Sequence, residues 1–129
     1  MNKAIVFDLD GTLIDTAQDL MAGGNAFFKH LGFKAILKKD QHENIAIRGG
    51  RAMIKFGLEL ENKDVTKENL DHYYPQFLKQ YQKHLTDTSK AYPEVEDTLH
   101  RLETLGWVIG ICTNKPEYLA EELLEKLKL

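Results

Sequence analysis

The chain has 129 residues, of which 43% are hydrophobic and 29% are charged, and its formal net charge at pH 7 is −3. This size fits one ordinary domain, or a small core with an insert. Acidic and basic residues are mixed along the sequence, so no basic stripe indicates a nucleic acid or an anionic membrane as a partner. No apolar run reaches transmembrane length and no secretory leader is visible, so we expect a cytoplasmic protein.

An apolar segment at residues 3–8 predicts a buried parallel strand, because its apolar run is continuous rather than alternating. It leads into two carboxylates, Asp8 and Asp10, and then Gly11, which permits a sharp turn. Both acids would lie on one side if the chain stayed extended. Two carboxylates this close repel each other unless a positive group holds them, and Mg2+ is the usual cation for oxygen ligands. The pair predicts chemistry at the carboxyl end of the strand.

The segment from residue 16 to residue 85 predicts helices alone. Apolar spacing and capping residues place these helices at 16–31, 38–47, 52–60 and 66–85. Gly23 and Gly24 weaken the first of them, and Pro75 predicts a kink in the last. A group of aromatic residues at helical spacing is interpreted as core rather than as a cofactor site: Tyr73, Tyr74, Phe77 and Tyr81.

A second strand is predicted at residues 107–112, between a helix at 95–105 and a final helix that begins at Pro116. The order of elements is that of a strand–helix–strand unit interrupted by the helical insert. Cys112 falls within the apolar pattern of the second strand and is interpreted as a buried, inert thiol, since one cysteine cannot form an internal disulfide.

Residues 8–15 (DLDGTLID) resemble the first motif of the haloacid dehalogenase superfamily, in its phosphatase branch. A second apolar strand ending in a hydroxyl residue, at 108–116, resembles the second motif. Their order and separation are similar to those in phosphoglycolate phosphatases. The resemblance implies an α/β fold: an incomplete Rossmann-like core with a parallel sheet, formed by residues 1–15 and 86–129, and an inserted α-helical cap of residues 16–85.

Asp8 is the predicted nucleophile, because a carboxylate can attack phosphorus and form an aspartyl phosphate. Asp10 is the candidate general acid for the leaving alcohol and then the base that activates water. The resemblance assigns the same roles, and it implies that an Asp8 oxygen and the Asp10 main-chain carbonyl bind Mg2+. The neighbouring residues Leu9, Gly11 and Thr12 are expected to contact the phosphate. The alternative is an aspartate-rich turn that caps a helix.

Thr113 matches the hydroxyl of the second motif, which donates a hydrogen bond to phosphoryl oxygens; an ordinary cap at the end of a strand is the alternative. Asn114 and Lys115 are further candidates for phosphate binding. For Lys115, the alternative is a solvated loop lysine. Arg48 and Arg51 enclose two glycines where similar phosphatases carry a specificity loop, and a guanidinium there would grip a substrate carboxylate. The alternative, that Arg48 and Arg51 are solvated residues of an ordinary loop, is equally open.

Two other kinds of residue receive structural interpretations. Asp15 also matches the first motif, but we expect it to cap the following helix. The five histidines show no spacing typical of metal ligands and are interpreted as residues of the surface or of helix faces: His30, His42, His72, His84 and His100.

The third-motif lysine and the fourth-motif acids of the family are not found in this sequence. We therefore expect a piece of a longer enzyme, rather than a naturally short protein that forms a homo-oligomer through an exposed sheet edge or has lost activity. Because those acids complete the metal shell, the 129-residue chain should hydrolyse phosphate esters slowly or not at all.

The predicted function is Mg2+-dependent hydrolysis of a small-molecule phosphate ester through an aspartyl-phosphate intermediate. The resemblance favours a small phosphorylated acid, with 2-phosphoglycolate as the leading substrate. Two alternatives remain open: a phosphosugar mutase of the β-phosphoglucomutase type, and a non-catalytic module that binds phosphate or a partner. A phospho-receiver domain also uses aspartates at strand ends, but the long helical insert after Asp15 disfavours it.

Overall fold

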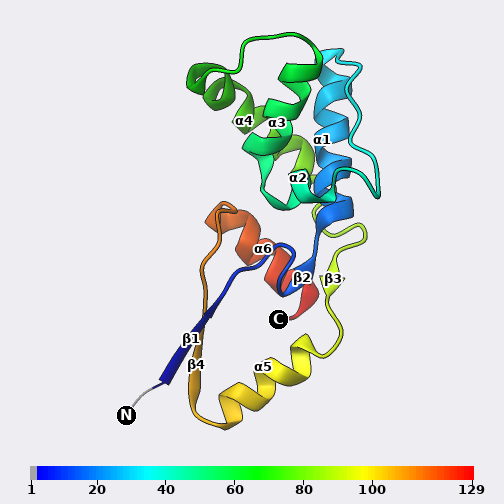
Figure 1. Cartoon of the computed structure of the whole chain (residues 1–129). Coiled ribbons are helices and arrows are strands. Elements are labelled where there is room, and N and C mark those ends of the chain that lie inside the picture. The colour runs from blue at the N-terminus through cyan, green and yellow to red at the C-terminus, as the bar shows by residue number, and fades with distance from the viewer. Residues whose placement is uncertain (1–2) are drawn as a thin grey trace.

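The computed structural model describes residues 3–129, and helices from the middle of the sequence form one end of the molecule (Figure 1). The first strand and the helix at residues 95–104 lie towards the other end, and the last helix lies between the two. In chain order the elements are β1 (Lys3–Phe7), β2 (Ile14–Asp15), α1 (Ala17–Leu31), α2 (Glu43–Ile47), α3 (Gly50–Leu60), α4 (Lys67–Gln82), β3 (Lys90–Ala91), α5 (Val95–Thr104), β4 (Trp107–Ile111) and α6 (Glu117–Leu127).

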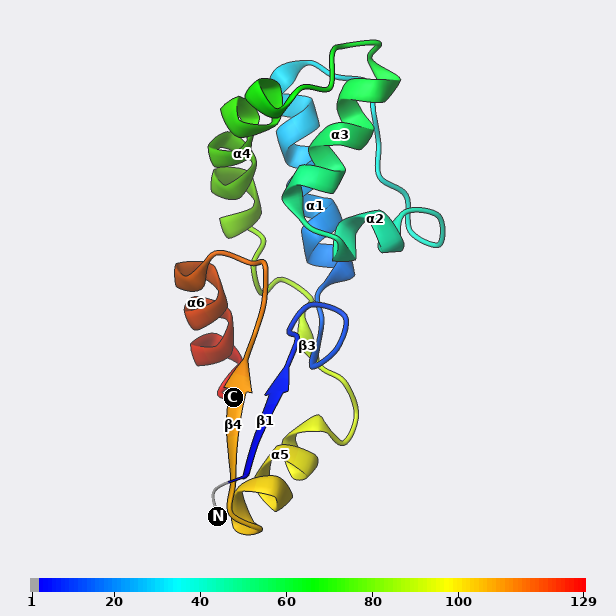
Figure 2. The same cartoon turned by 60° about the vertical axis from the view of Figure 1, so that its left-hand side comes forward.

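Strands β1 and β4 pair in parallel, with Lys3 opposite Trp107 and Phe7 opposite Ile111. The main-chain N–H of Cys112 extends this pairing by donating to the carbonyl of Phe7 over 2.8 Å. Figure 2 shows the two strands side by side, with α5 forming the connection that returns the chain to β4. Parallel pairing brings the carboxyl ends of both strands to the same edge, as expected. The predicted α/β fold with a parallel sheet is therefore confirmed.

The predicted burial of the first strand is wrong, and so is that of Cys112. Val6 is 63% exposed and Val108 is 61% exposed, and Cys112 is an exposed free thiol. An apolar run indicates burial only if other elements cover the sheet. Between residues 3 and 129 this sheet has two strands, so much of its apolar surface remains uncovered. Association of two copies through this surface stays a prediction.

A second, two-residue pairing joins the segments that lead into and out of the helices. Strands β2 and β3 are antiparallel, with Ile14 opposite Ala91 and Asp15 opposite Lys90. The expectation that Asp15 caps the next helix is wrong, because it lies exposed in β2. The N-cap residue of α1 is Thr16. Its hydroxyl makes no capping bond and instead donates a hydrogen bond to Asp10.

Asp19, in the first turn of α1, connects the same two segments through hydrogen bonds. Its carboxylate is 1% exposed and accepts hydrogen bonds from the main-chain N–H groups of Thr88 and Ser89 and from both of their hydroxyls, at 2.6–3.0 Å. The residues so joined are 69 and 70 positions apart in the sequence. This buried carboxylate is thus satisfied entirely by neutral donors, and it fixes where the chain leaves the helices relative to where it enters them.

Helices α1–α4, hereafter the helical region, contain no strand and hold the buried aromatic side chains Phe27, Phe28, Phe77 and Tyr81. The aromatic residues of α4 belong largely to this core, as expected: Phe77 and Tyr81 are buried, and Tyr73 packs edge-on against Phe27. Several predicted boundaries moved. Residues 38–42 form a turn before α2, α3 begins at Gly50 rather than Ala52, and α4 continues through Pro75 and ends at Gln82.

The glycine at position 23 has a packing role that helix propensity alone does not show. A Cβ added at Gly23 would lie 2.7 Å from the Cα atom of Tyr81, so α1 and α4 could not keep their present distance. Gly23→Ala gains about 1 kcal/mol in helix propensity but overpacks against main chain, which costs about 1–3 kcal/mol. We expect urea denaturation to show a net loss of about 1 kcal/mol. Gly110→Ala, whose Cβ would lie 3.7 Å from Val6, serves as the control; equal stability of the two variants would contradict this account.

Candidate active site

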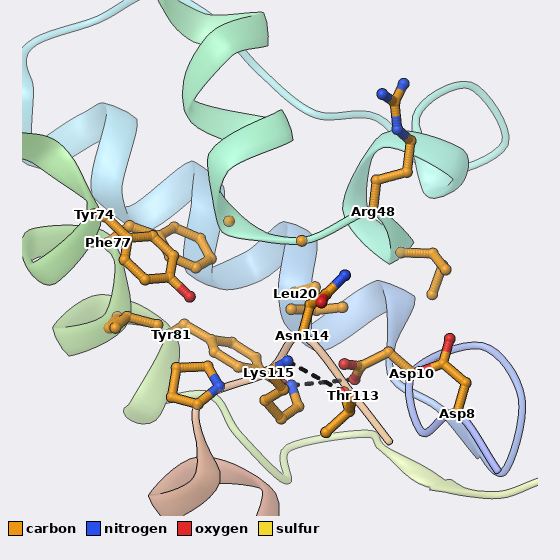
Figure 3. Close-up of a pocket in the computed structure, with 15 residues that line it drawn as sticks. Asp8, Asp10, Leu20, Arg48, Tyr74, Phe77, Tyr81, Thr113, Asn114 and Lys115 are labelled. Atoms are coloured by element: carbon orange, nitrogen blue, oxygen red, sulfur yellow. Dashed lines mark hydrogen bonds and ion pairs between the residues drawn. The ribbon is translucent and has the colours of Figure 1, made fainter. Parts of the chain in front are cut away.

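A cavity of about 430 Å3 lies where the carboxyl ends of β1 and β4 face the helical region (Figure 3). Its lining comes from segments that are distant in the sequence. The strand ends contribute Asp8, Asp10, Thr113, Asn114, Lys115 and Pro116, and the helical region contributes Leu20, Ile47, Arg48, Gly49, Gly50, Tyr74, Phe77, Leu78 and Tyr81. The cavity therefore has a charged and polar floor and a largely apolar wall.

The two predicted acids both face this cavity, although β1 ends at Phe7 before either of them. Asp8 is exposed, and its Oδ1 accepts a hydrogen bond of 2.7 Å from the main-chain N–H of Leu9. The side chain of Asp10 is 13% exposed, and its Oδ1 accepts a hydrogen bond of 2.7 Å from the Thr16 hydroxyl. One carboxylate is thus open to solvent at the cavity, and the other is held from the start of α1.

Lys115 is a buried part of this site, so its reading as a solvated loop lysine is wrong. Its side chain is 3% exposed, and its Nζ lies 3.1 Å from Oδ1 of Asp10. The same Nζ donates to the hydroxyl of Tyr81 over 2.6 Å and lies 4.4 Å from the centre of that ring. The pKa of Lys115 is lowered, because loss of solvation outweighs the opposing effect of Asp10. The ammonium compensates the negative charge on the cavity floor.

Tyr81 lines the cavity and contacts Lys115, a position that the sequence pattern did not reveal. It is fully buried in α4, as its aromatic helical spacing predicts, yet its hydroxyl reaches Lys115, which lies 34 positions away in the sequence. Burial raises the pKa of the Tyr81 hydroxyl, and the negative charges of Asp10 and Asp19 raise it further. Tyr81 therefore stays neutral and accepts the hydrogen bond from the ammonium.

The remaining residues of the two motifs lie at different distances from the cavity. The side chain of Leu9 is completely buried, so only its main chain can approach a phosphate. Gly11 and Thr12 are exposed and do not line the cavity; Thr12 faces a separate cavity of about 250 Å3 beside α5. Thr113 lines the active-site cavity, and its Oγ1 accepts a hydrogen bond of 3.1 Å from the main-chain N–H of Lys115.

The two arginines of the expected specificity loop have different surroundings. Arg48 lines the cavity, but Figure 3 shows its guanidinium pointing away from Asp8 and Asp10. Arg51 is not part of the lining: it pairs with Asp71 over 2.5 Å and lies over the ring of Tyr74. Of the two candidates, Arg48 is the one that lines the cavity.

The described residues offer an incomplete set of ligands for Mg2+. Residues 3–129 contain no group of three or more histidine, cysteine, aspartate or glutamate side chains that could hold a metal ion. The carboxylate of Asp10 is already engaged by Lys115 and Thr16. Asp8 and the main-chain carbonyl of Asp10 are the predicted ligands that remain, whereas Mg2+ takes about six oxygen atoms.

Comparison with known proteins finds phosphatases that are similar to this chain. A phosphoglycolate phosphatase of Agrobacterium fabrum is 37% identical over 129 residues, which are 100% of this chain and 55% of that protein. An N-acetylmuramic acid 6-phosphate phosphatase of Pseudomonas aeruginosa is 33% identical over 127 residues, which cover 97% of this chain and 54% of that protein. The chain thus spans about half the length of the curated relatives it matches.

The same architecture occurs in solved structures. A predicted phosphoglycolate phosphatase from Haemophilus somnus superposes with a TM-score of 0.76 at 25% identity, over 98% of this chain and 57% of that one. Across residues 3–129, no helix has both the length and the apolar character needed to cross a membrane. The sequence model described as haloacid dehalogenase-like hydrolase matches residues 5–129. The chain therefore belongs to the haloacid dehalogenase-like hydrolase family.

Proposed function

We propose that this chain carries the nucleophile, the phosphate-binding floor and the cap of a phosphomonoester hydrolase. The observation that supports this most strongly is that Asp8, Asp10, Thr113 and Lys115, from two distant strand ends, line one cavity. In the first step an oxygen of Asp8 forms a bond to phosphorus while the bond from phosphorus to the alcohol oxygen breaks. Water then attacks the aspartyl phosphate, which releases inorganic phosphate and restores the carboxylate.

Asp10 is proposed to move the protons of both steps. It gives a proton to the leaving alcohol and then takes one from the attacking water. Thr16 and Lys115 both bind its Oδ1, so they fix the orientation of the carboxyl group and direct proton transfer to Oδ2. The Thr113 hydroxyl and Asn114 are proposed to bind the phosphoryl oxygens from the β4 side of the cavity.

Magnesium is typical of this family, and the proposed ligands here are the Asp8 carboxylate and the Asp10 main-chain carbonyl. When bound, the cation would neutralise charge between the nucleophile and the phosphate. With only these two protein ligands, water and phosphate must fill most of its shell, so we expect weak binding. We expect the 129-residue chain to release phosphate slowly for the same reason.

The proposed substrate class is a small phosphorylated acid such as 2-phosphoglycolate. The names of the relatives support it, and so does the position of Arg48 and of the first turn of α3, which begins at Gly50 without an acidic residue. The free N–H groups of a helix start favour an anion. These features lie across the cavity from Asp8, where the carboxylate of a phosphorylated acid would reach them.

The arginine assignment can be tested by a comparison of substrates. Arg48→Ala should raise the KM for 2-phosphoglycolate about tenfold, because a charged hydrogen bond to the carboxylate is lost. The KM for p-nitrophenyl phosphate, which has no carboxylate, should stay within about twofold. Arg51→Ala should change neither value, since Arg51 is engaged by Asp71. An equal rise for both substrates would remove Arg48 from carboxylate recognition.

Product analysis distinguishes the proposed hydrolase from its alternatives. The chain is incubated with 2-phosphoglycolate, N-acetylmuramic acid 6-phosphate and β-glucose 1-phosphate, with and without Mg2+. Release of inorganic phosphate supports hydrolysis, whereas an isomerised sugar phosphate without release indicates a mutase. Binding of phosphate esters with neither product, also in the full polypeptide that the gene encodes, would indicate a non-catalytic module.

A further inference from the structure

We propose that Tyr81 of α4 is a positioning residue, whose hydroxyl holds the ammonium of Lys115 against Asp10 and thereby sets the charge of the cavity floor from the helical region. The contact itself is independent of any reaction. Its consequence for anion binding rests on the proposed function. Tyr81 would act through Lys115 and would not touch the phosphate.

The first step of the argument is the placement of the ammonium. Lys115 Nζ lies between Asp10 Oδ1, at 3.1 Å, and the Tyr81 hydroxyl, at 2.6 Å, so one donor group joins the end of β1 to the helical region. A lysine has a long flexible stem and normally places its ammonium in water. Here the ammonium is buried, so the oxygen atoms of Asp10 and Tyr81 replace part of its hydration.

The second step is that Tyr81 is itself rigid. Its ring stacks on Phe77 with a centroid distance of 5.9 Å and an interplanar angle of 15°. Its main chain lies against Gly23, where no Cβ would fit. Because both the ring and the main chain of Tyr81 are fixed, its hydroxyl has one position. The flexible side chain of Lys115 therefore adjusts to that hydroxyl, and not the reverse.

The third step concerns anions. Asp8 and Asp10 place two carboxylates on the cavity floor, and a phosphate that arrives there is also negative. Lys115 is the buried cation that offsets this repulsion. If its ammonium moves away from Asp10, the floor becomes more negative and phosphate binds less well. A hydroxyl of the helical region would then determine how well the opposite face of the cavity receives an anion.

Amine labelling tests the contact without any assay of function. With acetic anhydride and mass spectrometry, Lys115 of the parent chain should react at least about tenfold more slowly than the exposed Lys126, because burial limits access of the reagent more than the lowered pKa of Lys115 raises its share of free amine. Tyr81→Phe keeps the ring and removes the hydroxyl, and it should raise labelling at Lys115 severalfold while leaving Lys126 unchanged. Tyr73→Phe removes a hydroxyl from the same helix outside the cavity and should alter neither rate.

Three labelling results would overturn the inference. The first is a parent Lys115 as reactive as Lys126, a result that depends on no variant. The second is unchanged labelling of Lys115 in Tyr81→Phe. The third is a general rise at every lysine in that variant, which would indicate a packing role instead.

Binding of inorganic phosphate, followed by NMR titration, tests the consequence. Tyr81→Phe should weaken binding about tenfold in the parent chain and should have no further effect in a Lys115→Met background, because it acts through that lysine. Equal losses in both backgrounds would overturn the inference. If the parent chain fails to bind phosphate, the proposed function fails, and the labelling rates alone decide whether Tyr81 positions Lys115.

Discussion

Replacing Asp8 with asparagine should lower the release of inorganic phosphate by a factor of about 10⁴ or more. The amide keeps the size of the side chain but is not a nucleophile towards phosphorus, so no aspartyl phosphate can form. The fold should be unaffected, since Asp8 is exposed and makes one short-range hydrogen bond to the neighbouring main chain. Release is measured in the full polypeptide that the gene encodes, with Mg2+ present, because slow turnover of the 129-residue chain would hide the difference.

Asp15→Asn is the matched control for this experiment. Asp15 belongs to the same motif and is also exposed, but it lies in β2 and outside the cavity. Its variant should release phosphate at the parent rate within about twofold. Equal rates for Asp8→Asn and the parent would remove Asp8 as the nucleophile and leave the cavity as a binding site. A loss in Asp15→Asn equal to that in Asp8→Asn would indicate that the motif acts through structure.

The motif residues could be placed from sequence because their positions follow from strand geometry. Asp8 follows β1 directly and Thr113 lies two residues beyond the end of β4, and parallel strands end at one edge. Tyr81 could not be placed in the same way. Its spacing marks only a buried helix face, and its contact with Lys115 depends on how closely α1 packs against α4. Such contacts are set by tertiary packing, which a local pattern does not contain.

The same contrast between local sequence pattern and tertiary packing applies to the fold. Helical periodicity predicted the long helices α1 and α4, but a continuous apolar run predicted burial for β1 that the structure does not show. The run reports the hydrophobic character of a strand and not whether another element covers it. The two-residue strands β2 and β3 are too short to leave a pattern at all. They and Asp19 form the junction with the helical region, so the junction was the least predictable part of the chain.

That junction gives the largest expected effect on stability. Asp19→Asn should lower the free energy of unfolding by about 2–4 kcal/mol. The carboxylate of Asp19 accepts bonds from Thr88 and Ser89 through both oxygen atoms. An asparagine would replace one oxygen with an amide NH2 group that faces donors, and the N–H and O–H groups bound to that oxygen would lose their acceptor. Urea denaturation measures the loss, and hydrogen exchange at the amides of Thr88 and Ser89 should accelerate with it.

Asp87→Asn provides the comparison that separates this junction from a general effect of charge. Asp87 precedes Thr88 directly, but it is exposed, and within residues 3–129 its carboxylate pairs with the partly exposed His84. Its variant should therefore stay within about 0.5 kcal/mol of the parent. If both variants unfolded at the same urea concentration, the hydrogen bonds of Asp19 would not be what stabilises the junction. Faster exchange at Thr88 and Ser89 in Asp19→Asn alone would instead show that one buried carboxylate joins the two ends of the helical region.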